Sequence, residues 1–156
     1  MIIDYFRIYF RYFLATKYHK GISQSNTKEK LTMMNIEGIF KKVLDCSFQV
    51  HTILGPGLLE SAYLECLYYE LGQVGLKVEK QKPLPVVYKE VKLEAGYRID
   101  LFVEDCIVVE LKSVEAICDI HMTQILTYMK LSGCKLGLLA NFNVMHFKDG
   151  IKRVIL

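Results

Sequence analysis

The apolar residues that follow Asn35 recur every three or four positions, which is the spacing of an amphipathic helix. This pattern predicts a first helix that begins at Asn35, a residue suited to the N-cap, and ends at Gly55-Pro56-Gly57. A second helix is expected to start near Leu58 and to run towards Gly72 or Gly75. The domain therefore opens with two helices in succession.

After Gly75 the pattern changes to short runs rich in β-branched and aromatic residues, which is typical of strands. We expect first an edge strand that Pro83 and Pro85 close, and then a hairpin that turns at Lys89-Glu90. The remaining expected elements are strands at about 97–103 and 106–112, a helix at about 119–131 with Gly133 past its end, and strands at 135–142 and 151–156. This order predicts an α/β fold, with one mixed sheet flanked by helices.

The chain before this pattern has a different character. Residues 1–15 are apolar apart from a narrow polar stripe at helical spacing, and residues 16–34 have the composition of a flexible linker. The first segment could lie on a membrane surface or on a partner. It could also be a leader upstream of the native start, which we favour because Met33-Met34 directly precede the opening of the domain. We therefore expect an N-terminal extension and linker over 1–34 and a domain over 35–156.

The net charge of the chain is concentrated in its first 34 residues. They hold six basic side chains and two acidic ones, a net of +4, and the total of +3 therefore leaves −1 for the rest. Domains that bind nucleic acid usually carry a basic surface. The overall charge gives no support to that function here, so only a local patch of the domain could serve it.

The five cysteines form no C-x-x-C pair and have no zinc-like spacing with the four histidines. Most of them fall within apolar patterns, where a cysteine behaves as a small hydrophobic residue. We therefore expect reduced thiols in the core, as in a cytoplasmic protein. The sequence contains no run of about 18 apolar residues, so no membrane-spanning helix is expected.

Three charged residues in the otherwise apolar stretch from Gly96 to Ser113 are the strongest candidates for chemistry. Glu110 and Lys112 are two positions apart, so on a strand they share a face, and a tight hairpin would place Asp100 beside Glu110. Two carboxylates suit a hard divalent cation such as Mg²⁺ or Mn²⁺, and the lysine ammonium could orient an activated water. The residues alone fit equally well a structural ion pair on a solvated strand face.

Polar residues on two of the predicted helices are weaker candidates. Glu60 and Tyr63 share a face of the second helix, and Gln124 and Tyr128 share a face of the third. Glu60 could be a further metal ligand or a group that orients one, and Gln124 and Tyr128 could hydrogen-bond the metal-bound water or a phosphate. In isolation, an exposed first-turn glutamate explains Glu60 better, and a packed helix flank explains Gln124 at least as well. His121 is expected to be a packing or surface histidine rather than a ligand.

Four motifs, taken in order, resemble those of the small bacterial GxxExxY proteins, which are placed in the PD-(D/E)XK nuclease superfamily. They are GLLESAY at 57–63, YRIDLFVED at 97–105, VELKSVE at 109–115 and QILTYMKLSG at 124–133. The resemblance extends from about Asn35 to the C-terminus and includes NF…KDGIKR at 141–153. Residues 1–33 fall outside it. Because several motifs occur in the right order, the resemblance is specific.

The resemblance implies a restriction-endonuclease-like core with the element order α-β-β-β-α-β. It implies that Asp100 and Glu110, together with Glu60, bind the metal. Lys112 is then the lysine of the E-x-K motif and serves the attacking water, and Gln124 completes the site. A nuclease of this kind uses Mg²⁺ or Mn²⁺ to hydrolyse phosphodiester bonds in nucleic acid, with DNA as the expected substrate. The alternative, which the near-neutral domain keeps open, is a nuclease-fold module that binds nucleic acid or a protein without cleaving it.

Overall fold

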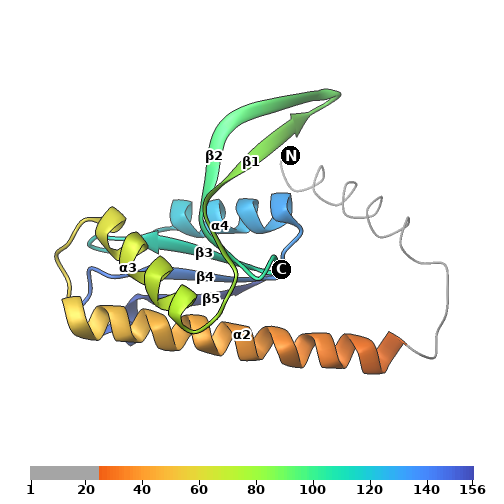
Figure 1. Ribbon diagram of the computed structural model, residues 1–156. Helices are drawn as coiled ribbons and strands as arrows, with labels where there is room; N and C mark the ends of the chain where they lie inside the picture. Colours follow the sequence, from red (N-terminus) through yellow and green to blue (C-terminus); the bar gives the residue numbers. More distant parts are fainter. Residues whose placement is uncertain (1–24) are drawn as a thin grey trace. The chain divides into compact units, whose positions relative to one another are not determined.

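The computed structural model describes residues 25–156, so the expected helix over residues 1–15 lies outside the described residues. Asn35–Leu156 forms one compact unit, which contains all the candidate site residues. The elements in chain order are helices α2 (Ser25–Leu54) and α3 (Glu60–Gln73), strands β1 (Val78–Tyr88), β2 (Val91–Val103) and β3 (Ile107–Lys112), helix α4 (Asp119–Ser132), strand β4 (Leu136–Asn141), the short helix η1 (Phe147–Gly150) and strand β5 (Ile151–Ile155) (Figure 1). No helix within residues 25–156 is both long and apolar enough to cross a membrane.

The five strands form one mixed sheet in the order β1-β2-β3-β4-β5. β3 and β4 are parallel, and the other neighbouring pairs are antiparallel. α4 is the crossover between the two parallel strands, and it ends at Gly133, whose φ of 73° is a conformation that glycine adopts without strain. The expected α/β fold with an α-β-β-β-α-β core is confirmed.

The two faces of the sheet are covered by different helices (Figure 1). α2 and α3 pack on one face and form the first core layer, and α4 packs on the other face and forms the second. Along β3, Val109 and Leu111 belong to the first layer and Val108 to the second, because successive strand residues point to opposite faces. Glu110 and Lys112 therefore lie on the face that α4 covers.

The predicted start of the first helix is wrong. α2 begins at Ser25 and runs through Asn35, so residues 25–34 of the expected linker are helical. This segment contains lysine, glutamate, leucine and methionine, which favour helices, and it has no glycine or proline to stop one. Its polar composition had suggested a linker, but helix propensity depends on side-chain type rather than on polarity.

Pro83 and Pro85 were expected to close the edge strand, but they do not. β1 continues through Pro83 and Pro85 to Tyr88, and β2 is likewise a single long strand. An edge strand tolerates proline because one row of its N–H groups has no partner strand. The pairing with β2 shifts register between Leu84 and Val86, around the second proline. The predicted turn at Lys89-Glu90 is confirmed.

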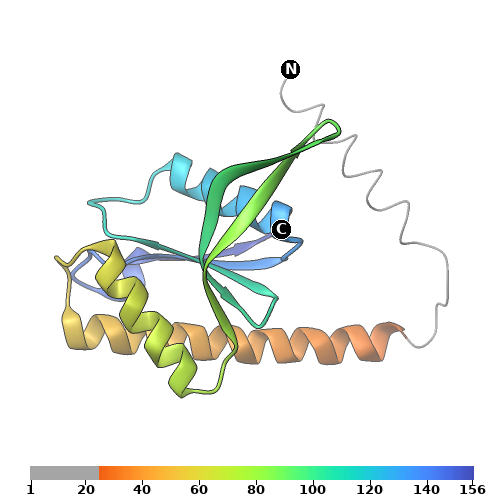
Figure 2. The same ribbon diagram turned by 45° about the horizontal axis from the view of Figure 1, so that its top comes forward.

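The β1–β2 hairpin bends part-way along its length, and its outer part stands away from the rest of the sheet (Figure 2). Leu101 and Val103 of β2 pack in the first core layer, whereas Ile99 packs with α4 in the second. Strict alternation would put Ile99 and Leu101 on the same face, so β2 turns at Asp100, which lies between them. Across the hairpin, Gln81 of β1 has a φ of 53°, which is left-handed for a residue other than glycine.

Candidate active site

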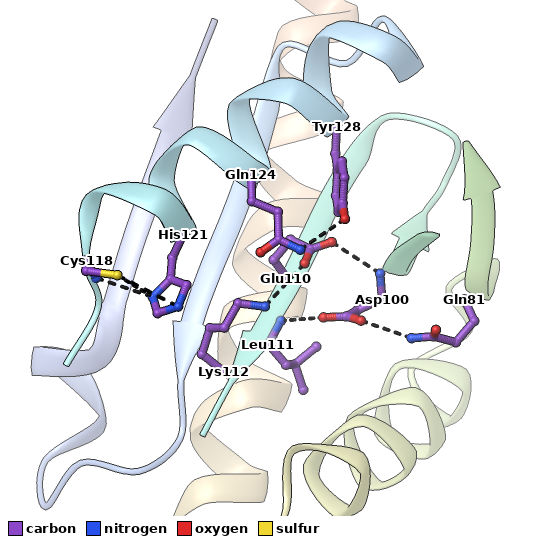
Figure 3. Close-up of polar contacts among 9 residues, drawn as sticks. All are labelled: Gln81, Asp100, Glu110, Leu111, Lys112, Cys118, His121, Gln124 and Tyr128. Carbon is purple, nitrogen blue, oxygen red and sulfur yellow. Dashed lines mark hydrogen bonds and ion pairs between the residues drawn. The ribbon is translucent and has the colours of Figure 1, made fainter. Parts of the chain in front are cut away.

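The β2–β3 hairpin brings the carboxylates of Asp100 and Glu110 together (Figure 3). The backbone ladder between the strands ends with the pair Leu101–Val109, and beyond it side chains replace the backbone as acceptors. Glu110 Oε1 accepts the backbone N–H of Asp100 at 3.3 Å, and Asp100 Oδ2 accepts the backbone N–H of Leu111 at 2.9 Å. The adjacency predicted from the hairpin is observed, and each carboxylate is anchored to the backbone of the opposite strand.

Glu110 and Lys112 form a buried pair and not the solvated one that the sequence had left open. Lys112 Nζ lies 3.6 Å from Glu110 Oε2, and the two residues are 8% and 1% exposed. Burial, and next the negative charge of Asp100, raise the pKa of Glu110 to about 8, although the Lys112 ammonium acts in the opposite direction. Without a bound cation, Glu110 is therefore largely protonated at neutral pH.

α4 places the side chains of Gln124 and Tyr128 over these charged groups (Figure 3). Gln124 Nε2 donates to Tyr128 Oη at 3.0 Å. Burial raises the pKa of the Tyr128 hydroxyl, and the charge of Glu110 acts in the same direction, while the bond from Gln124 opposes it. The predicted helix face thus meets the charged residues, and its two polar groups lie where they could bind a phosphate or a water.

Glu60 is the first residue of α3, and the preceding loop is tied to the end of β3 because Ser113 Oγ donates to the carbonyl of Leu58 at 2.7 Å. Among the residues that the structure describes, no three or more His, Cys, Asp or Glu side chains gather into a metal-binding group. Glu60 therefore does not complete a three-carboxylate set with Asp100 and Glu110 here. Its role as a third ligand stays a prediction.

Tyr63 is a structural residue rather than a member of the charged cluster. It is fully buried, its hydroxyl donates to the carbonyl of Gly55 at 2.6 Å, and it accepts the N–H of Leu58 at 3.1 Å. Its ring stacks on Phe142 with centroids 4.7 Å apart. These contacts fix the loop in which Gly57 has a φ of 103°, a conformation strongly disfavoured for any other residue. The tyrosine of the GLLESAY motif thus holds the loop that leads into Glu60.

His121 lies in the first turn of α4 and caps the helix. Its Nδ1 accepts the backbone N–H of Cys118 at 3.3 Å and lies 3.5 Å from Cys118 Sγ. Figure 3 shows the pair apart from the carboxylates of Asp100 and Glu110. The expectation of a packing or surface histidine agrees with this position.

Gln81, which sequence reasoning missed, also contacts the cluster. Its Nε2 donates to Asp100 Oδ1 at 2.9 Å (Figure 3). The pairing of β1 with β2 would have indicated it, because this pairing sets Gln81 opposite Asp100. The register shift between Leu84 and Val86 hides that pairing in the sequence, since counting back from the turn gives the wrong partner.

The donor set of the cluster fits a hard divalent cation. Asp100 and Glu110 present carboxylate oxygens, which Mg²⁺ and Mn²⁺ prefer, and Mg²⁺ commonly takes only one or two carboxylates from a protein, with water and phosphate oxygens as its other ligands. The raised pKa of Glu110 supports this fit. A cation that bound both the buried Glu110 and the half-buried Asp100 would favour the ionised form of Glu110, which burial and the charge of Asp100 otherwise disfavour.

The sequence model of the PD-(D/E)XK nuclease superfamily matches residues 37–154, which is more than half of the chain. The matched range includes Asp100, Glu110, Lys112 and both helices that flank them. The comparisons with curated proteins and with solved structures gave no match. The mixed five-stranded sheet with helices on both faces agrees with a restriction-endonuclease-like fold. The chain therefore belongs to the PD-(D/E)XK nuclease superfamily.

Proposed function

We propose that this protein is a metal-dependent nuclease of the GxxExxY type that hydrolyses phosphodiester bonds in nucleic acid, with DNA as its substrate. The observation that carries the proposal is the cluster of the half-buried Asp100 with the buried Glu110 and Lys112, in which two carboxylates and an amine converge at the end of the β2–β3 ladder. Membership of a nuclease superfamily supports the same reaction class.

Asp100 and Glu110 would hold Mg²⁺ or Mn²⁺ through their carboxylate oxygens. Glu60, at the start of α3, does not gather with them among the described residues and is the further ligand that the family resemblance implies. Such a cation lowers the pKa of a bound water and offsets the negative charge of the phosphate. The reaction itself joins the water oxygen to phosphorus and breaks the bond from phosphorus to the leaving sugar oxygen. The water gives up a proton to the solvent, and the sugar oxygen takes up a proton from the solvent.

Lys112 is the residue best placed to assist this step. Its ammonium lies 3.6 Å from Glu110 Oε2 and is almost fully buried, so its charge is little screened by water. It would orient the attacking water or stabilise the charge that develops on the phosphoryl oxygens. Gln124 and Tyr128 would donate hydrogen bonds to the same phosphate from α4.

The test compares cleavage of plasmid DNA, single-stranded DNA and RNA by the full chain, with Mg²⁺ or Mn²⁺ and with EDTA. Lys112→Ala should lower the rate by at least about 100-fold, the scale on which charge-stabilising and proton-transfer groups act. The matched control is Lys42→Ala, because Lys42 is an exposed lysine on α2, which packs on the face of the sheet opposite to the cluster. Equal rates for the parent and Lys112→Ala would contradict the mechanism.

The alternative function is a nuclease-fold module that binds nucleic acid or a protein without cleavage. The net charge of −1 over residues 35–156 keeps it open, because a solitary nuclease would be expected to carry a more basic surface. Titration with Mn²⁺ separates the two functions. A nuclease should bind Mn²⁺ and lose that binding in Asp100→Ala, whereas a non-cleaving module should show no Mn²⁺ binding that depends on Asp100.

A further inference from the structure

The regular backbone pairing between β1 and β2 is interrupted at Gln81 but present on either side of it. The neighbouring pairs Lys80–Leu101 and Lys82–Ile99 are in register, and their register sets Gln81 opposite Asp100, where the regular pairing is interrupted. At this point the backbone of Gln81 has a φ of 53°. The left-handed residue and the interruption of the pairing thus both lie opposite Asp100, the proposed metal ligand.

The side chain of Gln81 completes the hydrogen bonding of the Asp100 carboxylate. Oδ1 accepts from Gln81 Nε2 at 2.9 Å, and Oδ2 accepts from the backbone N–H of Leu111 at 2.9 Å. Each oxygen is therefore held by one neutral donor, and the plane of the carboxylate is fixed between β1 and β3 (Figure 3). Neutral donors leave the negative charge of Asp100 available to a cation, and each oxygen keeps a further acceptor site.

The bend of the hairpin explains the backbone conformation of residue 81 but not the choice of glutamine. A left-handed φ favours glycine, which has no Cβ, and asparagine or aspartate, whose side chains can hydrogen-bond to the nearby backbone, whereas other residues bear the steric cost of the Cβ. Strained residues of this kind persist near functional sites when the side chain contributes there. The contribution visible for Gln81 is the amide that it donates to Asp100.

We propose that Gln81 is a positioning residue that orients the Asp100 carboxylate for the divalent cation. The inference rests on the proposed function, because it assumes that Asp100 is a metal ligand, and it deepens that function by assigning a residue that supports the ligand. Groups that orient metal ligands by hydrogen bonds typically change metal affinity by about 10–100-fold when they are removed.

Two variants of the full chain test the proposal by isothermal titration with Mn²⁺. Gln81→Met keeps the length of the side chain and removes the donor, and Gln81→Gly removes the donor while it relieves the left-handed backbone. Both should raise the Kd for Mn²⁺ by about 10-fold or more. Because glycine suits the backbone at this position, Gln81→Gly should keep its melting temperature close to that of the parent, and it is the variant to rely on if Gln81→Met folds poorly.

The matched control is Gln49→Met. Gln49 Nε2 donates to Glu70 Oε2 at 2.9 Å, which is the same kind of amide–carboxylate bond but lies between α2 and α3 at the surface. This variant should bind Mn²⁺ with the parent's Kd.

The outcomes separate the new inference from the function on which it rests. If Asp100→Ala abolishes Mn²⁺ binding while Gln81→Met and Gln81→Gly both bind with the parent's Kd, the positioning role is overturned and the metal site stands. If Asp100→Ala binds Mn²⁺ as tightly as the parent, the proposed metal site itself fails.

Discussion

Burial favours the protonated form of the Glu110 carboxyl, so a cation that bound it would have to displace a proton. Its pKa is raised from 4.5 to about 8, chiefly by burial and secondarily by the charge of Asp100. The native state therefore binds this proton more tightly than the unfolded chain does. By linkage, the contribution of Glu110 to stability is fully present below about pH 4.5 and is lost as the pH rises through about 8.

We accordingly predict that the metal-free protein loses stability between about pH 5 and pH 8 because of this one group. Urea unfolding of the parent and of Glu110→Gln, measured across this range in EDTA, isolates the effect. The amide of the variant does not titrate, so the difference in the free energy of unfolding between the two proteins should change steadily with pH. A constant difference would show that Glu110 is ionised throughout.

At the level of single residues, the sequence predicted the charged centre of the cluster but not all of its partners. Asp100, Glu110 and Lys112 were found because charges inside apolar strands are conspicuous, and a hairpin is a local structure with a readable register. Gln81 was not found because its contact with Asp100 depends on a bend and a register shift in the longer hairpin.

At the level of elements, the GLLESAY motif sets the conformation of the loop that precedes α3. In GLLESAY, Gly57 permits the turn and Tyr63 reaches back to bind the carbonyl of Gly55 and the N–H of Leu58. The motif therefore fixes the angle at which α3 leaves the loop, and with it the position of Glu60.

Tyr63→Phe should destabilise the protein by about 1–3 kcal/mol, because it removes one hydroxyl that serves two backbone groups and leaves both without this partner. Thermal or urea unfolding measures the loss. Tyr69→Phe is the control on the same helix, since Tyr69 is 61% exposed, and its effect should stay within about 0.5 kcal/mol. Equal stabilities of the two variants would contradict the structural role of Tyr63.

Element types were predictable here, whereas two boundaries were not. The start of α2 was misplaced because residues 25–34 combine helix-favouring side chains with a polar composition. The C-terminal end of β1 was misplaced because proline stops a central strand but is tolerated in an edge strand, and only the order of the strands in the whole sheet shows that β1 lies at an edge.

For the whole molecule, the two core layers define how much of the chain the domain needs. The first layer, as far as the structure describes it, starts with Ile36, Ile39 and Phe40 on α2 and includes the inner faces of β2, β3 and β4. The site lies on the other face of the same strands, so the packing of the first layer holds in place the strands that carry the cluster.

We predict that a chain beginning at Asn35 unfolds with a free energy within about 1 kcal/mol of that of the full chain, because it retains the described core. A chain that begins at Lys41 lacks Ile36 and Ile39 as well as Phe40, which is 6% exposed, and should lose at least about 3–5 kcal/mol. Circular dichroism and urea unfolding of the three proteins check this order. A large loss in the chain that begins at Asn35 would show that earlier residues belong to the domain.

Beyond the pair Leu101–Val109, a carboxylate replaces a backbone carbonyl as the hydrogen-bond acceptor, and this replacement can be followed by NMR spectroscopy. The N–H of Leu111 donates to the Asp100 carboxylate and not to a backbone carbonyl, so its proton senses the charge density of a proposed metal ligand directly. A Mg²⁺ ion bound to Asp100 would draw electron density from that carboxylate and weaken the hydrogen bond.

In a nitrogen–proton correlation spectrum, the Leu111 amide should then shift upfield as Mg²⁺ is added, whereas the amide of Val43 within α2, on the other face of the sheet, should hardly move. A Leu111 signal that stays fixed at saturating Mg²⁺ would count against cation binding at Asp100. The amide of an apolar leucine is thus an internal reporter for the occupancy of the proposed site.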